Sequence, residues 1–122
     1  MAIPSRLLGS GLAPLAAVNI CGDVADSLTA AGTTNADALA LSAAINRVTT
    51  TALNTGVRLY LPEAGSQVMV INSGANALLV YPGTGASINA LTATTGGFSV
   101  AAGGRALFVG TGSANWFAVL SA

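Results

Sequence analysis

The chain has 122 residues, which suits one domain with a modest core. Only 7% of the residues are charged, against roughly 25% in an average soluble domain, and the formal net charge is zero. Four arginines without a single lysine are too few for a nucleic-acid-binding patch, and a neutral chain that is 52% hydrophobic is not intrinsically disordered. With so little charge to keep copies apart, the protein is expected to associate.

Residues 1 to about 32 look irregular, and we assign residues 1–27 to an N-terminal arm and residues 28–122 to a β-sandwich domain. The arm is rich in Gly, Pro and Ala, and its apolar residues follow no fixed period. Arg6 and the apolar run after it could pass for a secretory signal. Gly and Pro interrupt that run and no clean cleavage site follows, so we interpret it as part of the mature protein.

Cys21 is the only cysteine, which excludes a disulfide within the chain and fits synthesis in a reducing compartment. We expect it to be a small buried hydrophobe.

Residues 36–45 can be interpreted in two ways. Ala and Leu favour a helix that Asn35 would cap, whereas Leu39, Leu41, Ala43 and Ile45 alternate with the period of a strand. The β-branched residues that follow favour extended structure. We therefore predict a strand here, with a short helix as the alternative.

The rest of the chain has the pattern of short strands separated by turns. Gly, Pro, Asn and Ser clusters bound each apolar run, and the 41 residues between Glu63 and Arg105 carry no charge. These runs are too short to cross a membrane, which takes about 20 apolar residues in a row. The spacing predicts an antiparallel sandwich or jelly-roll with strands near residues 56–61, 67–71, 77–81, 87–89, 98–101, 105–109 and 116–120. In this prediction 67–71 and 77–81 form a hairpin, and so do 98–101 and 105–109.

Several of these strands are apolar on both faces, namely 68–71, 78–81, 106–109 and 116–120. A sandwich strand usually keeps one polar face. The second face is therefore expected to be covered, and a neighbouring subunit is the expected cover.

No catalytic, cofactor-binding or metal site is predicted. Without His or Lys the chain lacks the usual nucleophile–base pairs, Walker loops and Schiff bases. Asp23 and Asp26 are three apart but are expected to serve turns or caps rather than a calcium ion, and Glu63 to be a solvated turn residue. The glycines of residues 110–113 precede an aromatic strand rather than a helix, so they are not a dinucleotide fingerprint.

The arginines and aromatic residues offer contacts rather than chemistry. Each Arg has two interpretations, a solvated or locally paired side chain and a contact between subunits. Trp116 and Phe117 are adjacent, so in a strand one fills the core and the other faces outward. An exposed Trp116 that stacks on carbohydrate is the alternative. The residues we assign to a partner interface are Ile3, Arg6, Leu7, Leu8, Leu12 and Trp116.

Five segments of the chain resemble small virion proteins of tailed bacteriophages, among them capsid decoration (cement) proteins. They are Met1–Arg6, Leu28–Thr34, Ile45–Thr50, Val70–Pro82 and Gly85–Leu91. The resemblance implies a β-sandwich or jelly-roll, often a trimer, that sits on the outside of the phage head between major capsid subunits. It implies no catalytic residue.

These observations lead to one expected function and one alternative. We expect a capsid decoration protein that stabilises the assembled head, with the major capsid protein and further copies of itself as partners, and with no nucleic acid, membrane or cofactor. It would be made in the host cytoplasm and act on the outer capsid surface. The alternative is a phage tail, fibre or spike module that binds a receptor or glycan. A carboxylate-only enzyme is a remote third hypothesis.

Overall fold

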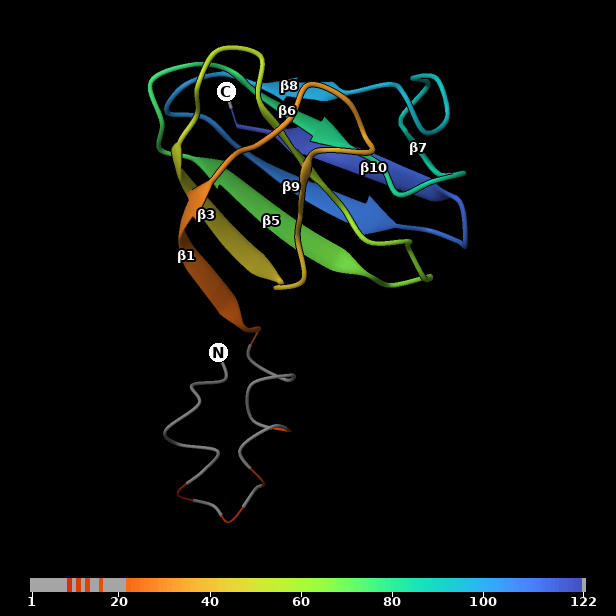
Figure 1. Ribbon diagram of the computed structural model, residues 1–122. Coiled ribbons are helices and arrows are strands. Elements are labelled where there is room, and N and C mark those ends of the chain that lie inside the picture. Colours follow the sequence, from red (N-terminus) through yellow and green to blue (C-terminus); the bar gives the residue numbers. More distant parts are fainter. Residues whose placement is uncertain (1–8, 10, 12, 14–15, 17–21, 122) are drawn as a thin grey trace.

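The computed structural model describes Gly9, Gly11, Ala13, Ala16 and residues 22–121, and this part of the chain is built from strands in two mixed sheets (Figure 1). The six-stranded sheet has the order β1 (Val24–Thr29), β3 (Ile45–Thr50), β5 (Gln67–Asn72), β9 (Arg105–Gly110), β10 (Asn115–Leu120) and β7 (Ser87–Ile88). The four-stranded sheet has the order β2 (Leu39–Ala40), β4 (Gly56–Arg58), β6 (Leu78–Tyr81) and β8 (Phe98–Val100). The all-β prediction is confirmed.

From β1 to β9 the chain alternates between the two sheets, with odd-numbered strands in the larger sheet and even-numbered strands in the smaller one. As a result β1, β3 and β5 run parallel to one another, and so do β2, β4 and β6. Each pair of successive strands among the first six thus makes one turn of the chain, which adds one strand to each sheet. Only β9 and β10 follow each other within one sheet, as an antiparallel pair.

The strand pairing differs from the antiparallel prediction. Five of the eight strand pairs are parallel and three are antiparallel. The two expected hairpins are wrong as well, because β5 pairs with β3 and β9 while β6 pairs with β4 and β8. Likewise β8 and β9 lie in different sheets. The turns between these strands carry the chain across the core rather than back along the same sheet.

Buried asparagines shape two of these corners. Asn72, at the end of β5, donates from Nδ2 to the Val100 and Asn76 carbonyls, both at 2.9 Å, and its Oδ1 accepts from Gly74 N at 3.0 Å. Asn46 donates from Nδ2 to the Ala43 carbonyl at 2.8 Å. Both side chains are fully buried. Their side-chain amides donate to backbone carbonyls at the points where the chain turns between sheets, so these buried amide groups have partners.

The inward faces of both sheets form one hydrophobic core. Phe108 on β9 packs edge-on against Phe98 on β8, with ring centroids 5.6 Å apart, and so links the two sheets. The largest fully buried apolar side chains are Trp116, Phe108, Leu59, Leu78, Ile88, Val48, Val57, Val68, Val70, Val80 and Val100.

Two predictions for the first half of the chain need correction or refinement. Residues 24–27 were assigned to the irregular arm, but they belong to β1 and pair with β3. In the 36–45 segment, β2 and the start of β3 are extended and residues 35–37 are a turn, so the strand interpretation holds better than the helix. Cys21 lies outside the described residues.

Candidate interaction surface

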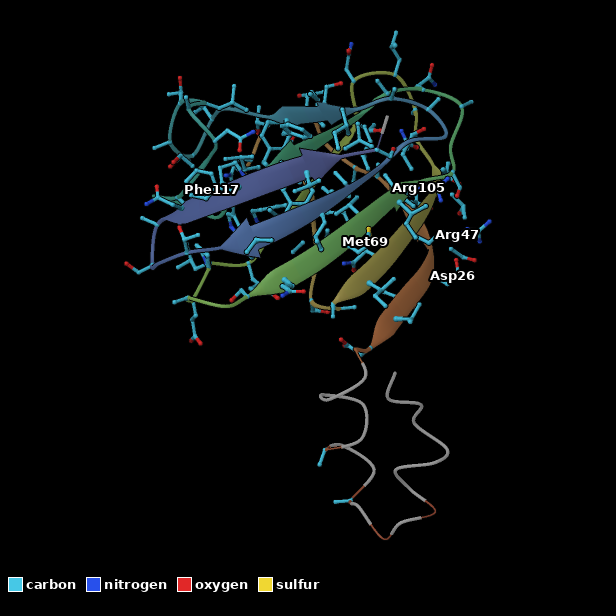
Figure 2. The ribbon with its side chains drawn as sticks, turned by 180° about the vertical axis from the view of Figure 1, so that it is seen from behind. Asp26, Arg47, Met69, Arg105 and Phe117 are labelled. Atoms are coloured by element: carbon cyan, nitrogen blue, oxygen red, sulfur yellow. The ribbon has the colours of Figure 1, made fainter. Side chains whose placement is uncertain are left out.

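The outward face of the six-stranded sheet is apolar across five strands. In register, Val24, Ile45, Met69, Leu107 and Val119 form one row that crosses β1, β3, β5, β9 and β10. In β5 and β9 the neighbours of these residues along the strand, Val68, Val70, Ala106 and Phe108, are buried in the core, so the row points away from the core. We call the outer face the set Val24, Ile45, Met69, Ile71, Leu107, Val109, Phe117 and Val119. Figure 2 views the molecule from this side, with Met69 near the middle.

This face is unusually open for apolar side chains. Val24 and Val119 are each 63% exposed and Phe117 is 50% exposed, while the others are half-buried against one another. Contiguous apolar patches of this kind on soluble proteins mark interaction sites. The prediction that strands are apolar on both faces is confirmed for this sheet, and no described segment of the chain covers the outer face.

Two arginines lie at one end of the outer face. Arg47, Ile71 and Arg105 form a row there, and Figure 2 shows Arg47 next to Asp26 of β1. Arg47 Nη1 donates to Asp26 Oδ1 at 2.9 Å. This hydrogen bond, more than the one from Ser27 N, lowers the pKa of Asp26. Arg105 makes no salt bridge with any described residue.

The opposite end of the sheet carries two acids. Asp23 precedes β1 and accepts a hydrogen bond from Ala44 N at 2.8 Å, just before β3. Glu63 lies beside the end of β9, where a Cβ on Gly110 would meet its carbonyl oxygen at 2.7 Å. Burial first, and then these two carboxylates, raise the pKa of Tyr60. The arginines therefore lie at one end of the outer face, its basic end, whereas Asp23 and Glu63 lie at the opposite end of the sheet near Tyr60, which packs on the buried Trp116.

The outward face of the four-stranded sheet, by contrast, is partly covered by the chain itself. Tyr81 lies over Gly56 and is only 5% exposed, and its hydroxyl donates to the Thr33 carbonyl at 2.9 Å. Asn35 is buried beside it and donates to the Pro82 and Thr94 carbonyls. The segment around Asn35 therefore covers the smaller sheet, and the larger sheet keeps the open face.

The two adjacent aromatic residues of β10 divide as predicted. Trp116 is fully buried and packs edge-on against Tyr60 with ring centroids 5.8 Å apart, whereas Phe117 points outward. Trp116 was assigned to a partner interface, but its side chain has no surface to offer a partner. Phe117 takes that place on the outer face.

The other residues assigned to the interface are Ile3, Arg6, Leu7, Leu8 and Leu12, and all lie outside the described residues. The outward residues of β3, β5, β9 and β10 were not singled out from sequence. The sequence feature that could have indicated them is the run of consecutive apolar residues in these strands, which makes both faces apolar. That feature does not show which face lies inside.

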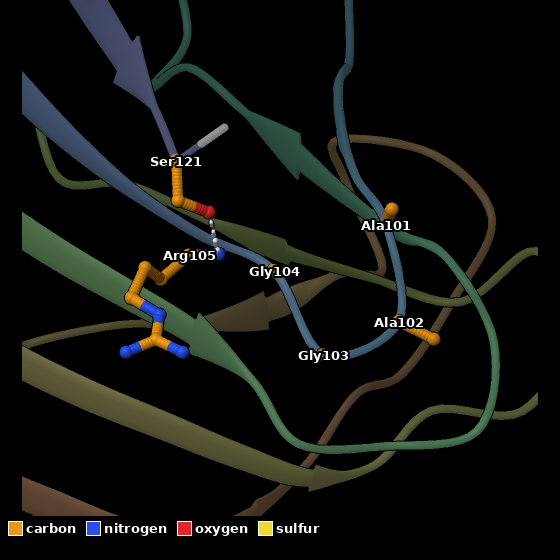
Figure 3. Close-up of a pocket in the computed structure, with 6 residues that line it drawn as sticks. All are labelled: Ala101, Ala102, Gly103, Gly104, Arg105 and Ser121. Atoms are coloured by element: carbon orange, nitrogen blue, oxygen red, sulfur yellow. Dashed lines mark hydrogen bonds between the residues drawn. The ribbon is translucent and has the colours of Figure 1, made fainter.

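An open hollow of about 520 Å³ lies at the basic end of the six-stranded sheet (Figure 3). It is lined by Ala101, Ala102, Gly103, Gly104, Arg105 and Ser121. The Ser121 hydroxyl accepts a hydrogen bond from Arg105 N at 3.1 Å. Its lining has a single cation and no acid or base to act on a substrate.

The carboxylates of Asp23, Asp26 and Asp37 hold local structure. Asp37 accepts hydrogen bonds from the Thr34 hydroxyl and from the backbone N–H groups of Thr34 and Thr33, and the first of these contributes most to lowering its pKa. Among residues 22–121, no three His, Cys, Asp or Glu side chains come together as metal ligands would. Asp23 and Asp26 thus act in the turn and pairing roles described above.

In the part of the chain that the structure describes, no helix has the length and apolar character needed to cross a membrane. Comparison with known proteins gives no match to any family model, to any curated protein sequence or to any solved structure.

Proposed function

We propose that this protein is a structural component of a tailed-bacteriophage virion that decorates the outer surface of the assembled head. The observation that carries the proposal is the outer face of the six-stranded sheet: a large apolar surface in a chain with hardly any charge. Such a surface serves lasting contact with other protein. The resemblance of the five sequence segments to phage decoration proteins supplies the assignment to the head.

The proposed mechanism is stabilisation by mass action. A protein that binds the assembled shell and not its separated subunits shifts the equilibrium toward the shell. We assign contact with the major capsid protein to the apolar N-terminal segment, which includes Ile3, Arg6, Leu7, Leu8 and Leu12. The β-domain would hold copies of the protein to one another, as a trimer if it follows the resemblance.

A sandwich description of the domain belongs to the same proposal. Two sheets that share one core support it, while the parallel pairs depart from the antiparallel pattern of a jelly-roll. The alternative function, a tail or spike module that binds glycans through an exposed Trp116, has lost its motivating feature because that side chain is buried.

The proposal is tested by binding to phage heads. Heads stripped of the protein are mixed with the full chain or with a variant that lacks residues 1–21, and bound protein is measured by co-sedimentation. The cut falls before Gly22 so that β1 stays intact. The full chain should saturate the heads and the shortened chain should bind weakly while its circular dichroism stays that of a β protein. Failure of the full chain to bind, or equal binding by both, would contradict the proposal.

A further inference from the structure

We infer that the free edge of β10 pairs with the same edge of a second copy, strand against strand about a two-fold axis, so that the two six-stranded sheets join. The inference does not rest on attachment to a phage head, because it follows from the hydrogen bonding of β10 alone. Its two-fold symmetry differs from the trimer that the resemblance implies.

The main-chain groups of β10 point alternately to β9 and away from it, as in any antiparallel pair. Ser121 N, just after β10, donates to the Arg105 carbonyl of β9 at 2.9 Å. Ser121 and every second residue before it therefore pair with β9. The N–H and C=O groups of Trp116, Ala118 and Leu120 point to the opposite side, where β7 lies.

The short strand β7 covers only the first part of that side. Asn89 N donates to the Trp116 carbonyl at 2.8 Å, and Asn89 Oδ1 accepts a hydrogen bond from Ala118 N at 3.1 Å. Asn89 has a φ of 52°, which ends the extended course of the chain. Among the described residues, no strand lies beside the Ala118 C=O or beside the main-chain groups of Leu120.

This free part of the edge lacks the features that keep sheet edges from pairing. Such features are charged side chains, proline, bulges and very short strands. At the opposite edge of the sheet, β1 has Asp26, a φ of 58° at Ser27 and shifts of register with β3. β10 has no charge, no proline and no register shift against β9. Its free end is therefore suited to pairing with another strand.

The side chains at this edge are apolar and open to solvent. Leu120 lies on the same face of β10 as the buried Trp116, yet it is 49% exposed. On the other face, Phe117 and Val119 are exposed as well. A strand placed beside Leu120 would therefore cover apolar surface on both faces of the sheet.

The free main-chain groups are complementary to themselves. With the two strands antiparallel and each Leu120 opposite its mate, the N–H of one Leu120 donates to the C=O of the other, and the reverse. The two Leu120 side chains then lie on the same face of the joined sheet and contact each other across the axis. Asn89 occupies the edge beside Ala118 N, so the second copy pairs only with the end of β10. Without charge on this strand, the two copies meet without repulsion.

The pair is expected to be weak in free solution. A contact along the end of one strand covers less than the total of roughly 1,000 Å² that a stable interface needs. Association should therefore appear at high protein concentration, or where many copies are held close together on one surface.

The first test is the mass of the purified full chain by sedimentation equilibrium, from about 10 μM to about 1 mM. The mass should rise with concentration from that of one chain, 11.8 kDa, toward that of two. Leu120→Pro removes the edge N–H without a hydrogen bond to β9, and edge strands tolerate proline, so this variant should stay single. Leu120→Ala keeps the N–H and should still pair. Met69→Lys changes the outer face instead and should pair like wild type.

The second test uses disulfide formation to locate the axis. Leu120→Cys in a Cys21→Ser background brings two thiols together, because opposite Cα atoms in such a pair lie about 5.5 Å apart, within disulfide range. Mild oxidation should give the covalent dimer roughly tenfold faster than for Leu53→Cys in the same background. Leu53 is the matched control because it is 74% exposed and lies outside β10.

Far-UV circular dichroism confirms that each variant is folded. A wild-type chain that stays single at the highest concentration, or whose mass tends to that of three chains, would overturn the inference. So would association that Leu120→Pro leaves unchanged or that Met69→Lys abolishes. Equal rates of dimer formation for Leu120→Cys and Leu53→Cys would overturn the proposed axis.

Discussion

Replacing Asn72 with Ala tests the corner by which β5 crosses to the other sheet. The substitution removes two hydrogen bonds from Nδ2, to Val100 and Asn76, and one from Gly74 N to Oδ1. A typical hydrogen bond contributes about 1 kcal/mol net, and a buried carbonyl left without a donor costs about 1–3 kcal/mol. Three such bonds are lost, so we expect the free energy of unfolding to fall by about 3 kcal/mol.

The assay is urea unfolding followed by far-UV circular dichroism, at a fixed protein concentration because association would add to stability. With a denaturant slope of about 2 kcal/mol/M, the midpoint should fall by about 1.5 M. The matched control is Asn115→Ala, because Asn115 is exposed and its hydroxyl contact from Ser87 is long, 3.4 Å. The control should stay within about 0.5 kcal/mol of wild type. Equal midpoints for Asn72→Ala and Asn115→Ala would refute the role of the buried corner.

Two further predictions concern the smaller sheet and the basic end. Gly56→Ala should cost about 2 kcal/mol in urea unfolding, because a Cβ there would meet the Leu79 carbonyl and the Tyr81 ring, both at 2.7 Å. Gly112→Ala, with open space around it, should be near neutral, and equal effects of the two variants would argue against the close packing. The pKa of Asp26 is lowered on folding, so its contribution to stability is present above its ordinary value of 3.8 and is lost as pH falls through the folded pKa. Asp26→Asn should therefore flatten the acid limb of the stability–pH curve, and an unchanged limb would contradict the Arg47 pairing.

Local structure was predictable from sequence where turn residues bound an apolar run. The strands β5, β6, β9 and β10 lie within a residue of their expected limits, because Pro, Gly and Asn clusters mark both ends. β1 was missed because its alternation is broken at Asp26 and Ser27, where the strand is irregular.

The pairing of strands was not predictable in the same way. A turn such as residues 72–76 signals that the chain changes direction, but it does not say whether the next strand returns to the same sheet. Asn72 is buried at this corner and its side chain donates a hydrogen bond to Val100 of the second sheet, which is visible only in the structure. The composition also could not tell which of two apolar faces is inside. The sequence therefore predicted that Trp116 and Phe117 point to opposite faces, but not which of the two is buried.

The open outer face explains the lack of charge that the sequence shows. Charged side chains would cost free energy if that face were covered, and the two arginines on it, Arg47 and Arg105, lie at one end. On the smaller sheet, Tyr81 and the segment around Asn35 already cover part of the outward face. The larger sheet therefore has the more open apolar face.

The most direct test of the central claim is the copy number of this chain in intact virions, measured by quantitative mass spectrometry against the major capsid protein. A protein that decorates the head should be present in hundreds of copies, in fixed proportion to the shell subunit. Its absence from purified virions, or a handful of copies as at a tail or a single vertex, would contradict the account.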